Sequence, residues 1–468
     1  MDWRNRMRTE KDPLGELAVD DQALWGIQTE RARSNFPISG LAPHPAYVRA
    51  TVAIKKAAAQ VHRQSGRLEP RLADAIVAAA DELLEEGRHL DQFVVDVFQA
   101  GAGTSHNMNA NEVLANRANE LLGARRGEYA PVHPNDHVNM AQSTNDVIPT
   151  AIALAALEML PGLDQALKKL ADELAARAAD WADYVKTGRT HLQDATPVRL
   201  GQEFGAYAEA IRRHRPAIAG AAAAAAELSI GGTAVGSGLN AETGYQRAVV
   251  AELGEITGLE LQPSANLFYS MQSMARFARL SGALRDLAVD LTRIANDFRL
   301  LGSGPRTGLD ELRLPAVQPG SSIMPGKVNP VMAECLNMIC LQVYGNDATI
   351  THAAAAGQLE LNVMMPVIAF NLCQSIQILA SGADVFAERC VAGLEANEEM
   401  LAYWLERNTM LATALAPRIG YAKAAEIAKE AVRTGESIPQ VARRLTDLSQ
   451  AELDQALDPT PMTAPGVR

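Results

Sequence analysis

Residues 277–301 read FARLSGALRDLAVDLTRIANDFRLL, and this stretch decides the fold that we expect. Large apolar side chains recur in it at alternating spacings of three and four residues, and no proline interrupts them. The series is Phe277, Leu280, Leu284, Leu287, Leu291, Ile294, Phe298 and Leu301. Because this spacing keeps every member on one stripe of an α-helix, it predicts a long helix packed along its length against other helices.

Other stretches extend the same pattern. A second series of apolar residues comprises Leu163, Leu167, Leu170, Leu174, Trp181 and Val185. Residues 367–386 are apolar on nearly every face, and such a helix needs other helices, often from other subunits, to cover it. The alanine run at 221–226 adds high helix propensity. We therefore expect an all-α fold with a bundle of long helices that is assembled between subunits.

Composition excludes several classes of function. The chain of 468 residues has a net charge of −12, which disfavours binding to the phosphate backbone of nucleic acids. The N-terminus lacks the apolar stretch of a signal peptide, and we see no run of about 18 strongly apolar residues. We therefore expect a cytoplasmic protein that does not bind membranes. The cysteines, Cys335, Cys340, Cys373 and Cys390, match neither a zinc site nor a disulfide framework, so we expect small buried core residues.

Short polar segments separate the helical stretches, and one of them is especially unusual. Residues 318–330 read QPGSSIMPGKVNP, with paired serines, Lys327 and Asn329 among glycines and prolines. A lysine and an asparagine two residues apart can grip a carboxylate, and backbone N–H groups beside a serine can stabilise it as an alkoxide. Val328 follows the lysine and the glycine spacing is wrong for a P-loop. A proline-rich surface turn is the alternative interpretation.

Further polar segments carry candidate residues. We expect a helix to begin near Thr104, Ser105 and Asn107. These side chains either cap the helix N-terminus or lie where it binds an anion. The same two interpretations apply to residues 143–146, Ser-Thr-Asn-Asp. His191 lies among polar groups between two expected helical segments. Both a structural and a functional role are open for this histidine. We find no motif for a metal or a hydride-carrying cofactor, so we expect neither.

Five segments together resemble the aspartase/fumarase superfamily. They are GTSHNMNANEVLANRA (103–118), HPNDHVNMAQSTND (133–146), GRTHLQDATP (188–197), GGTAVGSGLN (231–240) and GSSIMPGKVNP (320–330). The resemblance implies an all-α homotetramer of three-domain subunits whose central domains form a long helical bundle. It also implies active sites assembled from three subunits, a small dicarboxylate substrate, and a reversible elimination that gives fumarate.

The expected domain boundaries and site residues follow this resemblance. We expect an N-terminal domain at 1–140, a central domain at 141–395 that contains the loop 318–330, and a C-terminal domain at 396–468. The resemblance implies that Ser321 is the catalytic base on a mobile loop, with His191 and Glu334 as further catalytic residues. The implied substrate-binding residues are Thr104, Ser143, Thr144, Asn145, Thr190, Ser322, Lys327 and Asn329.

Roles within this set are also implied by the resemblance. Lys327, Asn329 and Thr190 hold one substrate carboxylate, and Thr104, Ser143, Thr144 and Ser322 hold the other. Asn145 and His191 face the departing group, and Glu334 orients or charges the histidine.

The motifs divide over the leaving group. Ala102, the Ser-Thr-Asn at 143–145 and GQLELNVM at 357–364 resemble deaminating aspartases. Gly232, His133 and the Ala-Thr-Pro at 195–197 look more like hydratases, and Met365 departs from the acidic residue of typical aspartases. Because a missing hydroxyl at position 102 bears directly on water activation, we expect elimination of ammonia from L-aspartate. Hydration of fumarate to L-malate is the alternative, and a non-catalytic structural relative is a third.

Overall fold

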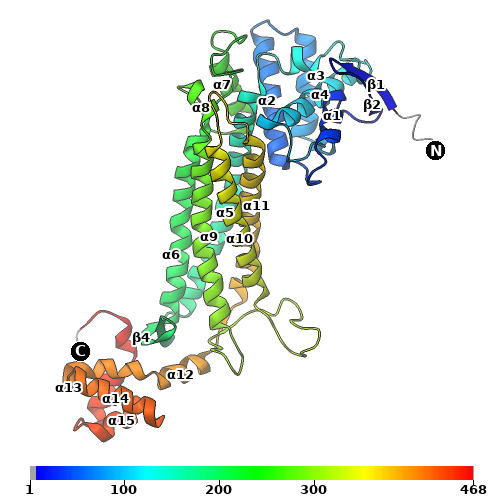
Figure 1. Cartoon of the computed structure of the whole chain (residues 1–468). Helices are drawn as coiled ribbons and strands as arrows, with labels where there is room; N and C mark the ends of the chain where they lie inside the picture. Colours follow the sequence, from blue (N-terminus) through cyan, green and yellow to red (C-terminus); the bar gives the residue numbers. More distant parts are fainter. Residues whose placement is uncertain (1–6, 467–468) are drawn as a thin grey trace. The chain divides into compact units, whose positions relative to one another are not determined.

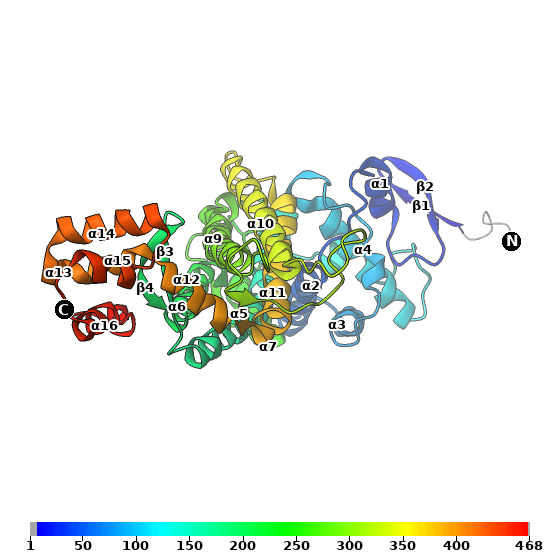
Figure 2. The same ribbon diagram turned by 90° about the horizontal axis from the view of Figure 1, so that it is seen from below.

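Long helices dominate the structure, a computed structural model that describes residues 7–466. The chain is 63% helical with few strands, which confirms the all-α prediction. Five helices exceed twenty residues, and they run side by side (Figures 1 and 2). They are α5 (Thr144–Asp180), α6 (Leu200–Ala222), α9 (Ala275–Leu301), α10 (Val331–Ala355) and α11 (Met365–Arg389).

The chain divides into two compact units, and each long helix contributes to both. Unit 1 runs to Asp164 and adds Arg215–Ala288 and Leu341–Ala380, whereas unit 2 consists of Gln165–His214, Val289–Cys340 and the chain from Ser381. The remaining elements of unit 1 are β1 (Met7–Asp12), β2 (Gly15–Asp20), α1 (Ile27–Asn35), α2 (Pro45–Gln64), α3 (Pro70–Leu84), α4 (Thr104–Leu121), β5 (Glu227–Leu228), α7 (Tyr245–Thr257), β6 (Gln262–Pro263) and α8 (Leu267–Gln272). The domain boundaries expected at 141 and 396 stay predictions.

Unit 2 carries the remaining strands and the C-terminal helices. They are β3 (Val185–Thr190), β4 (Gln193–Arg199), β7 (Leu312–Arg313), β8 (Glu395–Ala396), α12 (Glu398–Arg407), α13 (Ala416–Ile419), α14 (Tyr421–Thr434), α15 (Ile438–Leu445) and α16 (Gln450–Leu457). Helices α14, α15 and α16 gather around a core of their own that includes Ile427, Val441 and Leu453 (Figure 2). Ser449 and Glu452 form a capping box at the start of α16, which satisfies N–H groups that the helix leaves unpaired.

The apolar stripe of α9 is buried as its spacing predicts. All eight of its large side chains, from Phe277 to Leu301, are at most 7% exposed. In unit 2, the Phe298 ring packs against Phe204 of α6 and Phe386 of α11, with ring centroids 5.3 and 5.5 Å apart. The prediction of a long helix packed along its length is therefore confirmed.

Some expectations about the helices and cysteines were wrong. The second apolar series extends beyond the helix, because α5 ends at Asp180 and Val185 is the first residue of strand β3. The alanine run is only partly α-helical, since residues 223–226 tighten into a 3-10 turn. Cys335 is exposed, whereas Cys340, Cys373 and Cys390 are buried.

Two helices are more apolar than we expected. By length and composition, α5 and the stretch from Met365 to Gly393 are each sufficient to cross a membrane. Their most apolar windows are 67% and 50% buried inside the protein, however, as in the core helices of soluble proteins. This feature is therefore weak support for a membrane-spanning role.

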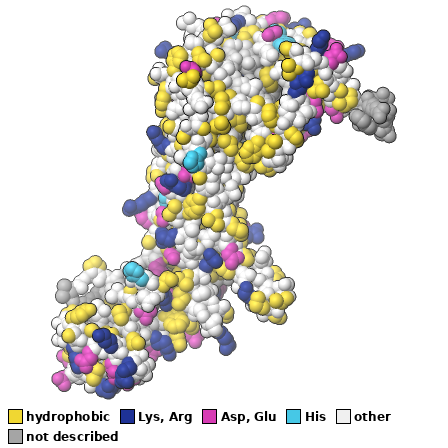
Figure 3. Space-filling model, viewed as in Figure 1, with side chains coloured by type: hydrophobic (Ala, Val, Ile, Leu, Met, Phe, Trp, Pro, Cys, Tyr) yellow, Lys and Arg dark blue, Asp and Glu magenta, His cyan; other side chains and the backbone are white. Residues whose placement is uncertain are grey.

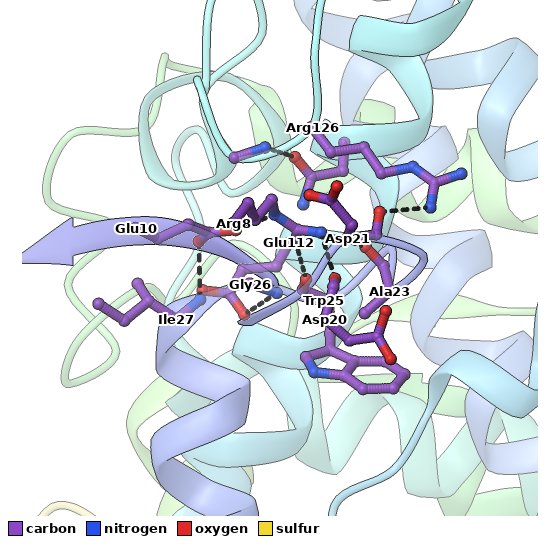
Figure 4. Close-up of polar contacts among 12 residues, drawn as sticks. Arg8, Glu10, Asp20, Asp21, Ala23, Trp25, Gly26, Ile27, Glu112 and Arg126 are labelled. Atoms are coloured by element: carbon purple, nitrogen blue, oxygen red, sulfur yellow. Dashed lines mark hydrogen bonds and ion pairs between the residues drawn. The ribbon is translucent and has the colours of Figure 1, made fainter. Parts of the chain in front are cut away.

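Two buried carboxylates cap the start of α1 in unit 1 (Figure 4). Glu112 accepts hydrogen bonds from the backbone N–H groups of Gly26, Gln28 and Thr29, at 2.9, 2.9 and 3.0 Å. Glu10 accepts one from Ile27 at 2.8 Å and another from the Tyr129 hydroxyl at 2.6 Å. A helix leaves its first N–H groups unpaired, and negative charge is stabilising there. Glu112, although part of a motif segment, therefore has a structural role.

We predict that Gly26→Ala destabilises the protein, because an added Cβ would lie 1.8 Å from the Tyr129 hydroxyl and 2.9 Å from the Glu112 carboxyl carbon. Overpacking of this kind lowers the free energy of unfolding by about 1–3 kcal/mol, measurable by urea titration. Gly162→Ala is the matched control, because an added Cβ within α5 meets nothing within 4 Å. Alanine in a helix interior is roughly 0.5–1 kcal/mol more favourable than glycine. Equal stability of Gly26→Ala and wild type would contradict the packing argument.

Candidate active site

The first group of predicted residues lies at two helix starts in unit 1. Thr104 is the first residue of α4 and is exposed. The turn before it holds Ala102 at φ 62°, and the Ala102 N–H donates to the Val363 carbonyl at 2.7 Å. Thr144 is the first residue of α5, directly after Ser143, and both are half-buried. Unpaired N–H groups at helix starts favour an anionic ligand.

Hydrogen bonds join the residues around the start of α5. Asn107 of α4 donates from Nδ2 to the Thr144 hydroxyl at 3.3 Å. The Asn145 N–H donates to the Ser143 hydroxyl at 3.2 Å, and its side chain donates to the Ala234 carbonyl at 2.8 Å. Unit 1 therefore brings Ser143, Thr144 and Asn145 together with the glycine-rich segment 231–240.

A buried carboxylate holds these two segments in register. Asp146 accepts hydrogen bonds from the backbone N–H groups of Ser143, Gly231 and Thr233, at 2.9, 3.0 and 2.9 Å. Burial raises the pKa of Asp146 to about 6, although the three N–H groups oppose this shift. The side chain thus orients the backbone around the predicted carboxylate-binding residues.

The second group lies on a hairpin in unit 2. Strands β3 and β4 pair antiparallel, with Thr190 opposite Gln193. His191 and Leu192 form the turn between them, each at φ 57°, as two-residue hairpin turns of the primed type require. His191 therefore lies between two helices, α5 and α6, as expected, and the link between them is a β-hairpin. The structure leaves Thr190 and His191 exposed.

A buried cluster of charges anchors this hairpin. The Lys186 ammonium in β3 lies 2.8 Å from a Glu203 oxygen and 2.9 Å from a Glu311 oxygen. The Arg189 guanidinium lies 2.8 Å from the other Glu311 oxygen. Lys186 and Glu311 are almost completely buried, so the charge of each must be compensated within this cluster. The cluster ties the hairpin to α6 and to the segment that leads into the loop 318–330.

The third group is the exposed loop 318–330 itself. The Ser321 hydroxyl oxygen accepts hydrogen bonds from the N–H groups of Met324 and Ile323, at 3.0 and 3.3 Å. The Lys327 ammonium donates to the Asn329 side-chain oxygen at 2.7 Å, and the Asn329 amide donates to the Gly320 carbonyl at 2.7 Å. A Cβ at Gly320 would lie 2.0 Å from the Lys327 carbonyl oxygen, so this conformation of the loop requires glycine at position 320.

The second and third groups both lie in unit 2, but no hydrogen bond joins them within the described residues 7–466. Across the described segments of unit 2 (165–214, 289–340 and 381–466), no hydrogen bond or ion pair joins the loop 318–330 to Thr190 or His191. Glu334 lies in the first turn of α10, half-buried, and Ser322 is exposed. The roles assigned to these side chains stay predictions. No group of three or more His, Cys, Asp or Glu residues within 7–466 is arranged to hold a metal ion.

The structure adds residues that the sequence analysis did not select. Lys55 of α2 is fully buried, and its ammonium donates to side-chain oxygens of Asn107, Asn139 and Gln142. A signal was available in the sequence. Val48, Val52, Lys55, Ala59 and His62 share one helical stripe, so a lysine and a histidine interrupt an apolar face.

Comparisons with known proteins agree with this combination of fold and motifs. A family model described as Lyase matches residues 15–345, and one described as Fumarase C C-terminus matches residues 411–464. The aspartate ammonia-lyase of Bacillus subtilis (strain 168) is 47% identical over 467 residues, which cover 100% of this chain and 98% of that protein. The class II fumarate hydratase 1 of Pseudomonas aeruginosa is 50% identical over 460 residues, 98% of this chain and 99% of that protein.

A solved structure shares the whole fold. The crystal structure of a fumarate lyase:delta crystallin from Brucella melitensis bound to cobalt superposes with a TM-score of 0.94 at 49% identity, covering 98% of this chain and 100% of that one. These matches define a lyase. The chain belongs to the aspartase/fumarase superfamily. Its relatives at similar identity include both ammonia-lyases and hydratases.

We predict that Glu311→Gln destabilises the protein by about 3–5 kcal/mol, because it leaves the buried cluster with two positive charges, Lys186 and Arg189, and only the Glu203 carboxylate to compensate them. Denaturant unfolding measures the change. Lys168→Gln is the control, since Lys168 pairs with Asp172 on the exposed surface of α5 and such pairs contribute about 0–1 kcal/mol. Similar losses for the two variants would show that the Lys186–Glu311 cluster does not anchor the hairpin.

Proposed function

We propose that this protein eliminates ammonia reversibly from L-aspartate to give fumarate. The observation that carries the proposal is the setting of Ser321, whose hydroxyl oxygen already accepts two backbone N–H groups. Such donors stabilise the oxygen as an alkoxide, which an ordinary serine would not form at neutral pH. An alkoxide is a base strong enough to take the weakly acidic proton from the carbon beside a carboxylate.

The second part of the proposal concerns the carbanion that forms. Its charge spreads into the adjacent carboxylate, which becomes a doubly charged aci form. Thr104, Ser143, Thr144 and Ser322 are the proposed donors to this group. A well-placed donor to a developing oxyanion contributes about 2.7–4 kcal/mol. The helix starts that carry Thr104 and Thr144 add their own preference for negative charge.

The other carboxylate needs a positive group, because the chain as a whole carries a charge of −12 and repels anions at long range. We assign this role to Lys327, with Asn329 and Thr190 as its companions. The hydrogen bond between Lys327 and Asn329 presents the ammonium and the amide on the same side of the loop. Closure of the loop over the substrate would exclude water and strengthen these interactions.

The leaving group is the finest part of the proposal. Asn145 and His191 are assigned to face it, with Glu334 as the group that orients or charges the histidine. Ala102 is 4% exposed and carries no hydroxyl that could bind a catalytic water, which favours loss of ammonia. Fumarate hydratase activity is the second candidate, because Gly232, His133 and residues 195–197 resemble hydratases and relatives of that activity are equally similar.

Self-association into a homotetramer is part of the proposal. After Glu334 in its first turn, the exposed face of α10 bears no Asp, Glu, Lys or Arg, and it includes Met338 and Leu341, which are 63% and 64% exposed. Hydrophobic side chains are also exposed on the face seen in Figure 3. An uncharged helix face of this kind is suited to packing against helices of other subunits, which could bring the three groups of site residues together.

Incubation of the purified protein with L-aspartate and, separately, with L-malate tests the reaction. We expect fumarate absorbance and free ammonia from L-aspartate, and loss of both in Ser321→Ala with an unchanged oligomeric mass, because the base is removed without changing the fold. Near-normal turnover by Ser321→Ala would exclude serine as the base. Consumption of L-malate without turnover of L-aspartate would favour the hydratase alternative.

Ala102→Ser tests the assignment of the leaving group separately. A hydroxyl at this position would give water a hydrogen-bonding partner near the start of α4 without adding any group that helps ammonia depart. We therefore expect no increase in ammonia release, followed by a coupled assay at saturating L-aspartate. A faster release of ammonia in this variant would contradict our interpretation of position 102.

A further inference from the structure

The Lys55 ammonium has an unusual environment in unit 1. It is buried, and its three hydrogens are taken by neutral side-chain amides: Asn107 at 2.8 Å, Asn139 at 2.8 Å and Gln142 at 2.9 Å. No carboxylate of the described residues forms an ion pair with it; the nearest acidic influence is that of Asp146. A buried charge without a paired ion is costly, so hydrophobic packing alone does not explain a lysine here.

The contact with Asn107 determines which way that amide points. Because its oxygen accepts from Lys55, its NH₂ group is turned away, toward the Thr144 hydroxyl at 3.3 Å and the Asn139 oxygen at 3.3 Å. A hydroxyl has one hydrogen to donate and two lone pairs that accept. When Thr144 accepts from Asn107, its own hydrogen stays available for another acceptor.

We propose that Lys55 is a positioning residue for the substrate carboxylate: through Asn107 it keeps the Thr144 hydroxyl oriented as a donor. The inference rests on the proposed function, in which Thr144 binds that carboxylate. Without the ammonium, the Asn107 amide can turn over and present its oxygen to Thr144. The Thr144 hydrogen would then be spent on Asn107 and lost to the substrate.

The surrounding charges are consistent with this role. Burial lowers the pKa of Lys55 to about 7, and Asp146 of α5 opposes the shift. His106 of α4 stays neutral, because burial and then the charge of Lys55 lower its pKa to about 3. The charged form of Lys55 has three hydrogens, one for each of the three amide oxygens around it, so this form keeps the Asn107 oxygen turned toward α2.

Binding of succinate, a four-carbon dicarboxylate without a leaving group, tests the proposal by calorimetry. A hydrogen bond to a charged group is worth about 1.5–3 kcal/mol, so we expect roughly 10–100-fold weaker binding by Lys55→Met. Asn107→Asp should lose at least as much: it keeps an acceptor for Lys55 but has no NH₂ to donate to Thr144, and its negative charge also repels the dicarboxylate. This second variant keeps a partner for the buried charge, so it carries the test if Lys55→Met does not fold.

A double-mutant cycle with Thr144→Val distinguishes positioning from a merely structural role. If Lys55 acts through Thr144, Lys55→Met has little further effect once the hydroxyl is gone, because effects within one relay are not additive. Asn107→Asp then keeps only the part of its loss that comes from its negative charge, so its loss is smaller than in the wild-type background. Lys56→Met is the matched control, since the neighbouring Lys56 pairs with Asp81 of α3; it should bind succinate like wild type. Additive losses, or wild-type affinity in Lys55→Met and Asn107→Asp, would overturn the proposal.

Succinate binding also separates this inference from the assignment of the reaction. Wild-type protein that binds succinate but turns over only L-malate would refute the ammonia-lyase proposal and leave the Lys55 cycle interpretable. If the wild-type protein turns over L-aspartate but the losses of succinate binding in Lys55→Met and Thr144→Val are additive, only the role of Lys55 is refuted.

Discussion

Burial of the apolar stripe along α9 is the constraint on which the rest of the structure depends. Phe298 packs between rings from α6 and α11, and every large side chain of the stripe is withdrawn from water. Each such side chain contributes about 1.5–3 kcal/mol when fully buried, which offsets the entropy lost in ordering a long helix. Rigid helices in turn give the polar segments fixed starting points. Ser143 and Thr144 lie at the start of α5, and the Ser321 loop leads directly into α10. Chemistry on loops is precise only when the scaffold that carries them does not move.

Buried charges set the local geometry around the candidate site. Asp146 orients three backbone N–H groups, Lys55 orients three amides, and Lys186 with Glu311 anchors the hairpin of His191. Charges in such places are poor contributors to stability, because their desolvation opposes their attraction. Their role here is to orient their neighbours, because a buried charge determines which way each amide or N–H group in contact with it points. Two backbone N–H donors orient the Ser321 hydroxyl in the same way.

Backbone strain marks the same segments. Ala102, His191, Leu192 and Thr233 all have positive φ, a region that residues with a side chain seldom adopt, and all lie within or beside the motif segments. Such conformations cost about 1–3 kcal/mol each and persist only where the surroundings hold them. In this protein the holding contacts are identifiable: the Val363 carbonyl for Ala102, the Asp146 carboxylate for Thr233, and the strand pairing of β3 with β4 for the turn at His191. Contacts with other parts of the chain thus hold these positive-φ residues in place within or beside the motif segments.

The local pattern in the sequence was sufficient to predict the bundle. The three-and-four spacing from Phe277 to Leu301 places these apolar side chains on one stripe of a helix, and only packing against other helices buries that stripe. The motif segments, in their order, were likewise sufficient for the superfamily, whereas the roles that they imply for Ser321, Lys327 and Thr144 stay predictions. Tertiary structure alone decided the setting of those residues. The hairpin at His191 forms where a link between helices was expected, because strand pairing and the Lys186–Glu311 contact join residues distant in the chain. The contact of Lys55 with Asn107, 52 residues later, depends on how α2 packs against α4, and no periodicity along the chain encodes which way an amide will turn.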